Sequence, residues 1–147
     1  WSSDVCSSDL TNPKLGWRPL IPQLVEDIEN ERQPVINWDG EQTRDLIHVD
    51  DIVRALILGA ESEKFGGEMF LLSTNMETSV NKAFEIISKI TGKNTTPKYT
   101  EKLPGDLRRM VLSYEKAKKA LGFIPKITVE EGVKRYVQWY RNTNPSL

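Results

Sequence analysis

Residues 69–72 of the chain read Met-Phe-Leu-Leu, an uninterrupted apolar run that follows a glycine pair and Glu68. A half-exposed strand alternates apolar and polar residues, whereas a continuous apolar run of this length fits a strand covered on both faces. Such strands occur in parallel sheets whose faces carry helices. Residues 68–72 are therefore predicted to form a buried strand, and the chain is predicted to have an α/β fold.

Amphipathic segments of helical periodicity account for much of the remaining chain. They predict helices over residues 21–31, 52–59, 80–91, 114–121 and 129–141, and short extended segments over residues 34–38, 44–49 and 98–102. Asp50 or Asp51 is expected to cap the start of the helix over residues 52–59. Thr78 or Ser79 is expected to cap the start of the helix over residues 80–91, and Gly92 is expected to end it. Thr128 and Glu131 are expected to form a capping box at the start of the last helix. The last helix is expected to bury one apolar face, made of Val129, Val133, Tyr136, Val137 and Tyr140.

The composition excludes several classes of function. The 147 residues suffice for one domain, and 20 basic against 21 acidic residues leave no basic field for nucleic acid. A single cysteine and a single histidine exclude a Cys-rich zinc site and a His-rich metal centre. The apolar runs are far shorter than the roughly 20 residues of a membrane span. We therefore expect no nucleic-acid partner, no membrane partner and no metal.

The first ten residues do not fit the rest of the chain. They repeat Ser-Ser-Asp at positions 2–4 and 7–9, and they lack the basic and apolar regions of a signal peptide. The stretch from Val5 to Leu10 resembles a translated sequencing adapter. Residues 1–10 are therefore expected to be an artefact, and residues 11–147 are expected to be a gene fragment that begins abruptly at Thr11.

A longer motif lies at residues 39–51, which read Asp-Gly-Glu-Gln-Thr-Arg-Asp-Leu-Ile-His-Val-Asp-Asp. This segment resembles the stretch GDGxQxRDFIHVDD of the NAD-dependent epimerase/dehydratase family, the extended short-chain dehydrogenases that act on nucleotide sugars. Other segments resemble further motifs of that family in the same order: residues 20–24 (vIPxfi), 68–80 (gxxfNIGsgxxtSV), 104–108 (xGDvr) and 116–125 (KAkxxLGwxP). The resemblance extends over residues 11–147 and is greatest to UDP-glucose 4-epimerase-like members.

The resemblance implies that residues 11–147 are the C-terminal, substrate-binding portion of such an enzyme. The implied fold has helices with a few short strands, plus a last strand of a Rossmann sheet whose N-terminal part is missing. The apolar faces of residues 69–72 are therefore expected to be left uncovered in this chain. In this family the Gly-rich loop that seats NAD or NADP precedes the matched region, as do the Ser/Thr and Tyr-x-x-x-Lys catalytic groups. No such glycine pattern occurs here, because Gly66 and Gly67 precede the apolar run instead of following a strand.

Binding of a nucleotide sugar, in the first place a UDP-linked one, is therefore the expected function. The chain is expected to carry no catalytic and no cofactor-binding residue, and to be inactive alone. The resemblance implies a cytoplasmic homodimer for the intact enzyme. It leaves open whether that enzyme is an epimerase, a dehydratase or a reductase, and whether it uses NAD or NADP.

Tyr114 and Lys118 also satisfy the spacing Tyr-x-x-x-Lys. Residues four apart share a helix face, which is the geometry that a lysine needs to lower the pKa of a phenol. The pair, however, lies at the start of the segment that resembles the KAkxxLGwxP motif (residues 116–125), and this segment is not the catalytic helix of the family. It is therefore interpreted as part of a solvated helix face.

Arg44 is the leading candidate for substrate contact. A guanidinium offers planar, paired donors to phosphate oxygens, and members of the family place an arginine at this position on the diphosphate of the substrate. The alternative is a surface ion pair between Arg44 and Asp45, which would contribute little to stability.

Other candidate positions follow from the same resemblance. Val35 and Asn37 match the extended segment that frames the nucleotide base, and alternate residues of a strand face one side. An aromatic residue that stacks on the base often occupies the position of Asn37, so base recognition is expected to be weaker here. Leu20 matches a helix entry whose N–H groups meet phosphate. Asp106 is expected to accept a hydrogen bond from a ribose or sugar hydroxyl; for all of these positions, ordinary strand or turn roles are the alternative.

One family feature is missing from the diphosphate site. The arginine that usually lies two residues before the glycine of the xGDvr turn is replaced by Leu103, and the neighbouring Lys102 offers only a point charge. Arg108 and Arg109 are the candidates to compensate for that loss.

A second hypothesis treats the chain as a self-contained, non-catalytic helical module for binding or interaction. It predicts a methionine start, a closed core and cooperative unfolding of the isolated chain. The abrupt beginning of the chain favours the first hypothesis.

Overall fold

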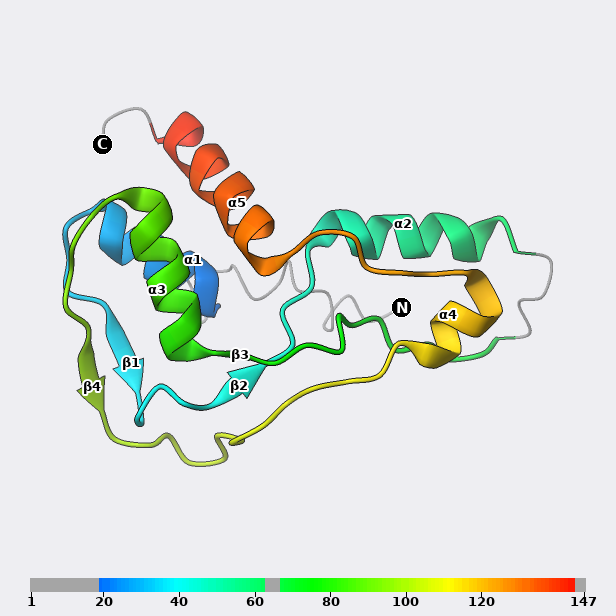
Figure 1. Ribbon diagram of the computed structural model, residues 1–147, viewed down its shortest axis with the longest axis horizontal. Helices are drawn as coiled ribbons and strands as arrows, with labels where there is room; N and C mark the ends of the chain where they lie inside the picture. Colours follow the sequence, from blue (N-terminus) through cyan, green and yellow to red (C-terminus); the bar gives the residue numbers. More distant parts are fainter. Residues whose placement is uncertain (1–18, 63–66, 145–147) are drawn as a thin grey trace.

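The computed structural model describes residues 19–62 and 67–144, so the proposed adapter segment at residues 1–10 lies outside the described residues. Helices are interspersed with short strands, as the sequence predicts, and the α/β class is confirmed (Figure 1). The elements are α1 Leu20–Glu29, β1 Val35–Asn37, β2 Thr43–Arg44, α2 Val49–Ala60, β3 Thr78–Ser79, α3 Val80–Thr91, β4 Lys98–Thr100, α4 Glu115–Leu121 and α5 Val129–Thr143.

The larger hydrophobic core lies between α1, α3, α5 and β1. Its buried residues are Leu24, Val25, Ile28, Ile36, Val80, Ile86, Ile87, Val133 and Val137. The predicted apolar face of α5 is confirmed, since Val133 and Val137 are buried and Val129, Tyr136 and Tyr140 pack against this core. Burying each large apolar side chain contributes about 2 kcal/mol, so this group of elements is a stable platform.

A smaller core joins α2 to α4. Ala55 of α2, Ala117 of α4 and Phe123 are buried together, and Tyr114 meets Phe123 edge-on at 6.0 Å between ring centroids. Figure 1 shows α2 and α4 at one end of the molecule, with β2 and β3 between them and the larger core. The Asp51 carboxylate connects the two groups: it is fully buried and accepts from the backbone N–H groups of Lys126 and Ile127, just before α5.

Two small sheets hold the loops in place. In the parallel sheet, β1 pairs with β4 so that Asn37 lies opposite Thr100. In the antiparallel sheet, β2 pairs with β3 so that Arg44 lies opposite Thr78. The predicted strand over residues 44–49 is much shorter than expected, because the Asp45 carboxylate accepts from Thr74 N at 2.8 Å and from Thr74 Oγ1 at 2.7 Å, which ends the ladder.

The strand predicted over residues 68–72 is not formed in this structure. Phe70 and Leu72 pack against the smaller core, whereas Met69 and Leu71 are 81% and 49% exposed. One side of the apolar run is therefore uncovered, as expected for a segment whose parallel sheet lies outside this chain. The physical reason is pairing: a strand needs a neighbour, and within the described ranges strands pair only in the two small sheets.

The helix ends confirm most of the predicted caps. Ser79 accepts from Lys82 N at the start of α3, Gly92 closes that helix in the left-handed region, and Thr128 accepts from Glu131 N at the start of α5. The predicted aspartate cap of α2 is wrong, because His48 is the N-cap and its Nδ1 accepts from Asp50 N. In the parts of the chain that the structure describes, no helix is long and apolar enough to cross a membrane.

Candidate nucleotide-sugar site

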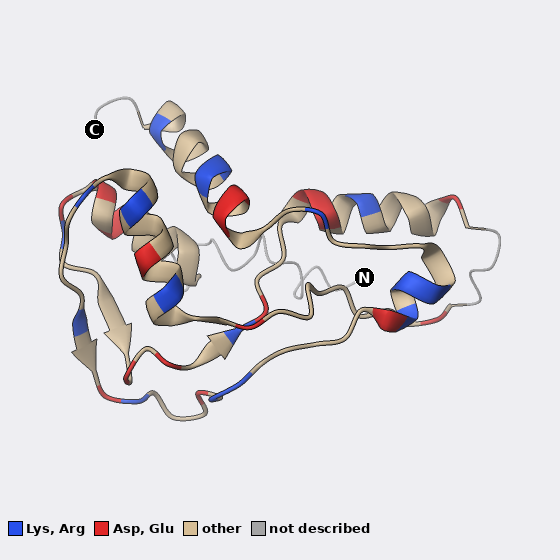
Figure 2. Cartoon of the chain, in the orientation of Figure 1, with Lys and Arg blue, Asp and Glu red and all other residues tan. Residues whose placement is uncertain are grey.

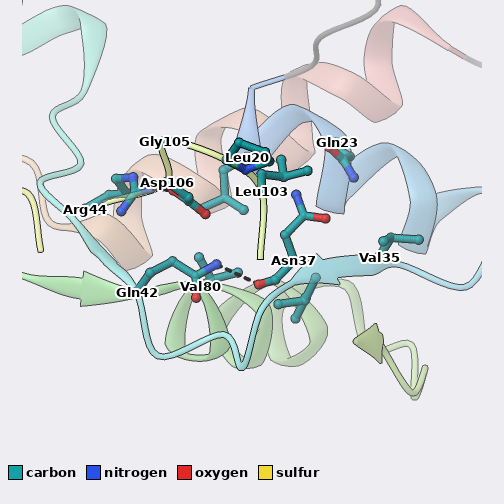
Figure 3. Close-up of a pocket in the computed structure, with 12 residues that line it drawn as sticks. Leu20, Gln23, Val35, Asn37, Gln42, Arg44, Val80, Leu103, Gly105 and Asp106 are labelled. Carbon is teal, nitrogen blue, oxygen red and sulfur yellow. Dashed lines mark hydrogen bonds and ion pairs between the residues drawn. The ribbon is translucent and has the colours of Figure 1, made fainter. Parts of the chain in front are cut away.

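A cavity of about 590 Å³ opens between the start of α1, the end of β1, β2 and the loop that follows β4 (Figure 3). Both polar and apolar residues line it: Leu20, Gln23, Val35, Ile36, Asn37, Gln42, Arg44, Val80, Leu103, Pro104, Gly105 and Asp106. Its volume is in the range of small-molecule sites.

The cavity gathers most of the residues that the sequence nominated. Leu20, Val35, Asn37, Arg44 and Asp106 all line it, although they come from four separate segments of the chain. The structure thus places these candidates around one space, and ligand binding by them remains a prediction.

Arg108 and Arg109 do not line the cavity and are held by carboxylates elsewhere. Arg108 donates to Asp39 at 2.7 and 2.8 Å, and its guanidinium lies 4.6 Å from the Trp38 ring centroid. Arg109 pairs with Glu77, which also accepts from Thr43 Oγ1 at 2.8 Å. The Arg109 guanidinium lowers the pKa of Glu77 from 4.5 to about 2, so at neutral pH this pair is fully charged.

Arg44 is fixed at the cavity wall by several contacts. Its Nη1 donates to Thr43 O at 2.8 Å and to Leu107 O at 2.9 Å, and its Nη2 pairs with the Asp106 carboxylate. The side chain is 25% exposed. The alternative pairing with Asp45 is wrong, because Asp45 is occupied by Thr74 and Asn75. Arg44 is therefore held in one orientation beside the cavity before any ligand arrives.

The loop that carries Asp106 is fastened to β2 and to Trp38. Thr43 N donates to Arg108 O at 2.9 Å, and Met110 N donates to Thr43 O at 3.2 Å. The Trp38 ring holds two cations, with Lys102 Nζ 4.4 Å from its centroid and the Arg108 guanidinium 4.6 Å away. Such cation–π contacts contribute about 0.5–1 kcal/mol each at exposed sites. Lys102 is thus directed to Trp38, and Leu103 lines the cavity in the place of the missing arginine.

Val35 and Asn37 form the opposite wall. Both line the cavity, and Ile36 between them lines it as well, so alternation along the strand does not by itself select the lining residues. The Asn37 side chain is oriented by Thr100 across the parallel pair, because Thr100 Oγ1 donates to Asn37 Oδ1 at 2.9 Å. This contact leaves the amide nitrogen of Asn37 as the group available to a ligand, where a stacking ring is usual in the family.

The start of α1 supplies a further polar surface. Leu20 is the first residue of α1, and the N-cap Pro19 makes no side-chain hydrogen bond to the helix. No acidic residue lies in the first turn. The partial positive charge of this helix end is therefore not neutralised by a carboxylate of its own, which favours an anion near Leu20.

Gln42 also lines the cavity, although no sequence motif singled it out as a binding residue. It is 3% exposed, and its Nε2 donates to Asn37 O at 2.8 Å, the contact drawn in Figure 3. A usable signal existed, since residues 42 and 44 lie two apart in an extended segment and so share a face. Gln23, Val80, Pro104 and Gly105 are also lining residues that no motif had singled out as binding residues.

The described residues offer no site for a metal or a dinucleotide. They contain no cluster of three or more His, Cys, Asp and Glu residues able to hold a metal ion. Their parallel pair, β1 with β4, leads from β1 into the Trp38–Gly40 turn and not into a Gly-rich loop and helix. The residues present therefore do not fit NAD, whose phosphates need such a loop.

The Tyr114–Lys118 pair has ordinary structural contacts. The Tyr114 ring packs against Phe123, and Lys118 Nζ lies 3.6 Å from Glu115 Oε1. Neither residue lines the cavity. Lys118 lies on an exposed helix face, as expected, whereas Tyr114 contributes to the smaller core.

Charged residues of both signs are spread over the whole of the described chain (Figure 2). Within the cavity, the charged lining residues are Arg44 and Asp106, which neutralise each other. The wall therefore carries little net charge when it is empty.

Comparison with known proteins assigns the family. Residues 10–136 match the family model described as GDP-mannose 4,6 dehydratase. A UDP-glucose 4-epimerase of Mycolicibacterium smegmatis is 35% identical over 111 residues, which is 76% of this chain and 35% of that protein. The chain thus spans well under half the length of this relative.

Solved structures agree with that result. The UDP-glucose 4-epimerase of Thermotoga maritima with UDP-glucose superimposes with a TM-score of 0.81 at 37% identity, over 86% of this chain and 40% of that one. The dTDP-glucose 4,6-dehydratase of Bacillus anthracis in complex with NAD superimposes with a TM-score of 0.78 at 28% identity, over 86% and 40% of the two chains. On this evidence the chain belongs to the NAD-dependent epimerase/dehydratase family and corresponds to a part of its members.

Proposed function

We propose that this chain is the substrate-binding portion of an NAD-dependent nucleotide-sugar epimerase or dehydratase, and that its cavity holds the nucleotide diphosphate. The observation that carries the proposal is the convergence of Arg44, Asn37, Asp106 and the start of α1 on one cavity. The relatives named above include an epimerase solved with UDP-glucose, which supports a UDP-linked ligand.

Each wall of the cavity has a distinct role in this proposal. The Arg44 guanidinium and the N–H groups at the start of α1 hold the diphosphate, because both favour an anion. Val35 and Asn37 frame the base, and Asp106 accepts from a hydroxyl of the ribose or the sugar. With Leu103 in place of a second cation, affinity for the diphosphate is expected to be weak.

The redox chemistry of the family requires a site that the described residues do not form. We therefore assign binding and orientation of the sugar nucleotide to this chain, and we place the dinucleotide site and the catalytic tyrosine in a further part of the intact enzyme. The relative with NAD is a dehydratase of which this chain covers 40%, which supports that division.

The exposed apolar stripe of α2 fits the same division. Val49, Val53, Leu56 and Ile57 are between 48% and 64% exposed and lie on one face of the helix. We propose that the dinucleotide-binding part packs on this face. Added as a separate polypeptide, the dinucleotide-binding part of a family member should associate with the wild-type chain and much more weakly with the Val53→Lys, Leu56→Lys double variant. Equal association with both would contradict this placement.

Calorimetric titration of the full chain tests the main proposal. UDP-glucose and UDP should bind with similar weak affinity, whereas uridine should bind far more weakly because it lacks the diphosphate. Incubation with UDP-glucose and NAD should yield no UDP-galactose. Equal affinity for uridine and UDP would overturn the binding assignment, and turnover by the chain alone would overturn the division of roles.

A further inference from the structure

Gln42 has a buried acceptor with no partner. Its Oε1 makes no hydrogen bond within the described residues, although the side chain is only 3% exposed and lines the cavity. Buried polar atoms without a partner are rare in native structures, and each one needs an explanation. Two further atoms of this kind, Ser88 Oγ and Thr95 Oγ1, belong to residues that do not line the cavity.

The orientation of this side chain is fixed by its neighbours. Gln42 Nε2 donates to Asn37 O at 2.8 Å, so a flip of the amide would bring two oxygens together. The backbone is held as well, because Gln42 O accepts from Val80 N at 3.2 Å. Oε1 therefore remains an acceptor without a partner in a residue that lines the cavity, where a donor of a bound ligand, or a water molecule that such a donor replaces, can satisfy it.

The position of Gln42 lies between the proposed base and diphosphate subsites. It bonds to Asn37 on one side and precedes Arg44 by two residues on the other, and all three line the cavity. A group placed between a base and a diphosphate belongs to the nucleoside. Its neutral donors are the hydroxyls of the ribose and the imide N–H of a uracil-type base.

We propose that Gln42 Oε1 accepts a hydrogen bond from a neutral donor of the bound nucleoside, so that Gln42 determines specificity for ligands that carry this donor. The proposal rests on the proposed function. A hydrogen bond from the ligand would satisfy the Oε1 atom of Gln42, which is otherwise buried without a partner. A ligand without a donor at this position would leave Oε1 unsatisfied and should therefore bind more weakly.

A chemical double-mutant cycle tests the proposal on the full chain. UDP, 2′-deoxy-UDP, 3′-deoxy-UDP and N3-methyl-UDP are titrated into the wild type, Gln42→Met, Gln42→Asn and the control Gln33→Met. Gln33 is a matched control because its amide is exposed and donates to Thr96 O at 3.2 Å, away from the cavity. Thermal melts of each variant report whether it is folded.

In the wild type and in Gln33→Met, one of the three analogues should bind about tenfold more weakly than UDP, equivalent to about 1.4 kcal/mol. In Gln42→Met or Gln42→Asn the same analogue should bind within twofold of UDP, and the affected analogue identifies the base or the ribose as the donor.

Three other results would overturn the proposal. Equal binding of all four nucleotides by the wild type would show that none of these donors is used, whether or not the variants fold. A penalty that persists undiminished in both Gln42 variants would assign the donor to another acceptor. No binding of UDP by the wild type would overturn the proposed function and this proposal together, whereas UDP binding without coupling overturns this proposal alone.

Discussion

Arg44 and Asp106, which are 62 residues apart in the sequence, form an ion pair in the wall of the cavity. Their side chains are 25% and 16% exposed, so the pair is shielded from much of the solvent. Arg44 is further held by two backbone carbonyls. An anion that enters the cavity therefore meets a guanidinium that is already oriented, and it competes with Asp106 for that guanidinium.

The variant Asp106→Asn should bind inorganic pyrophosphate about tenfold more tightly than the wild type. The substitution removes the negative charge beside Arg44, and the expected 1.4 kcal/mol is below the roughly 4 kcal/mol of a close charge pair at an effective dielectric constant of 20. Calorimetry at low ionic strength measures the change. Unchanged or weaker pyrophosphate binding would show that Asp106 does not compete for Arg44.

The buried Asp51 carboxylate should be a major contributor to stability. It accepts from Lys126 N and Ile127 N, both at 3.0 Å, and pairs with Arg54 at 2.7 Å. We expect Asp51→Asn to lower the free energy of unfolding by about 3 kcal/mol, since it leaves buried partners unpaired.

The neighbouring Asp50→Asn is the matched control for this prediction. Asp50 is exposed and pairs with Arg135 at 3.0 Å, so its loss should cost less than about 1 kcal/mol. Urea denaturation followed by circular dichroism compares the two variants. Equal losses in both would contradict the role given to Asp51.

The Glu77–Arg109 pair predicts a pH dependence of stability. Hydrogen bonds from Arg109 and Thr43 lower the pKa of Glu77 from 4.5 to about 2. A lowered pKa in the folded state means that the carboxylate stabilises the fold above pH 4.5, and that this contribution disappears as the pH falls toward 2.

Thermal melts of the wild type and of Glu77→Gln measure this contribution. The wild type should melt at a higher temperature at pH 6, and the difference should shrink progressively between pH 4.5 and pH 2. A difference that stays constant over this range would show that ionised Glu77 is not its source.

Local features of the fold could be predicted from the sequence, because they depend on neighbouring residues. The Ser79 cap, the Gly92 end and the apolar face of α5 are encoded within a few positions of one another. The His48 cap was missed because two aspartates, the commoner capping residues, lie two and three positions after it. The expected strand over residues 68–72 failed for another reason, since a strand requires pairing that a local pattern does not supply.

The sequence could predict which residues line the site, but it could not predict how their side chains pair with one another. Motif resemblance nominated Arg44, Asn37 and Asp106, and all three line one cavity. The pairing of Arg44 with Asp106, and of Arg109 with Glu77, depends on loops that meet only in the folded chain. Adjacent arginines in the sequence gave no indication that both Arg108 and Arg109 are held by carboxylates outside the cavity.

The most direct test of the account is the affinity of the full chain for UDP in the wild type, Arg44→Met and Arg135→Met. Arg135 is an exposed arginine on α5 that pairs with Glu131, away from the cavity, so it controls for loss of a charge. If Arg44 holds the diphosphate, calorimetry should show at least a tenfold loss of UDP affinity in Arg44→Met and less than a twofold change in Arg135→Met. UDP binding of equal strength in all three proteins would contradict it.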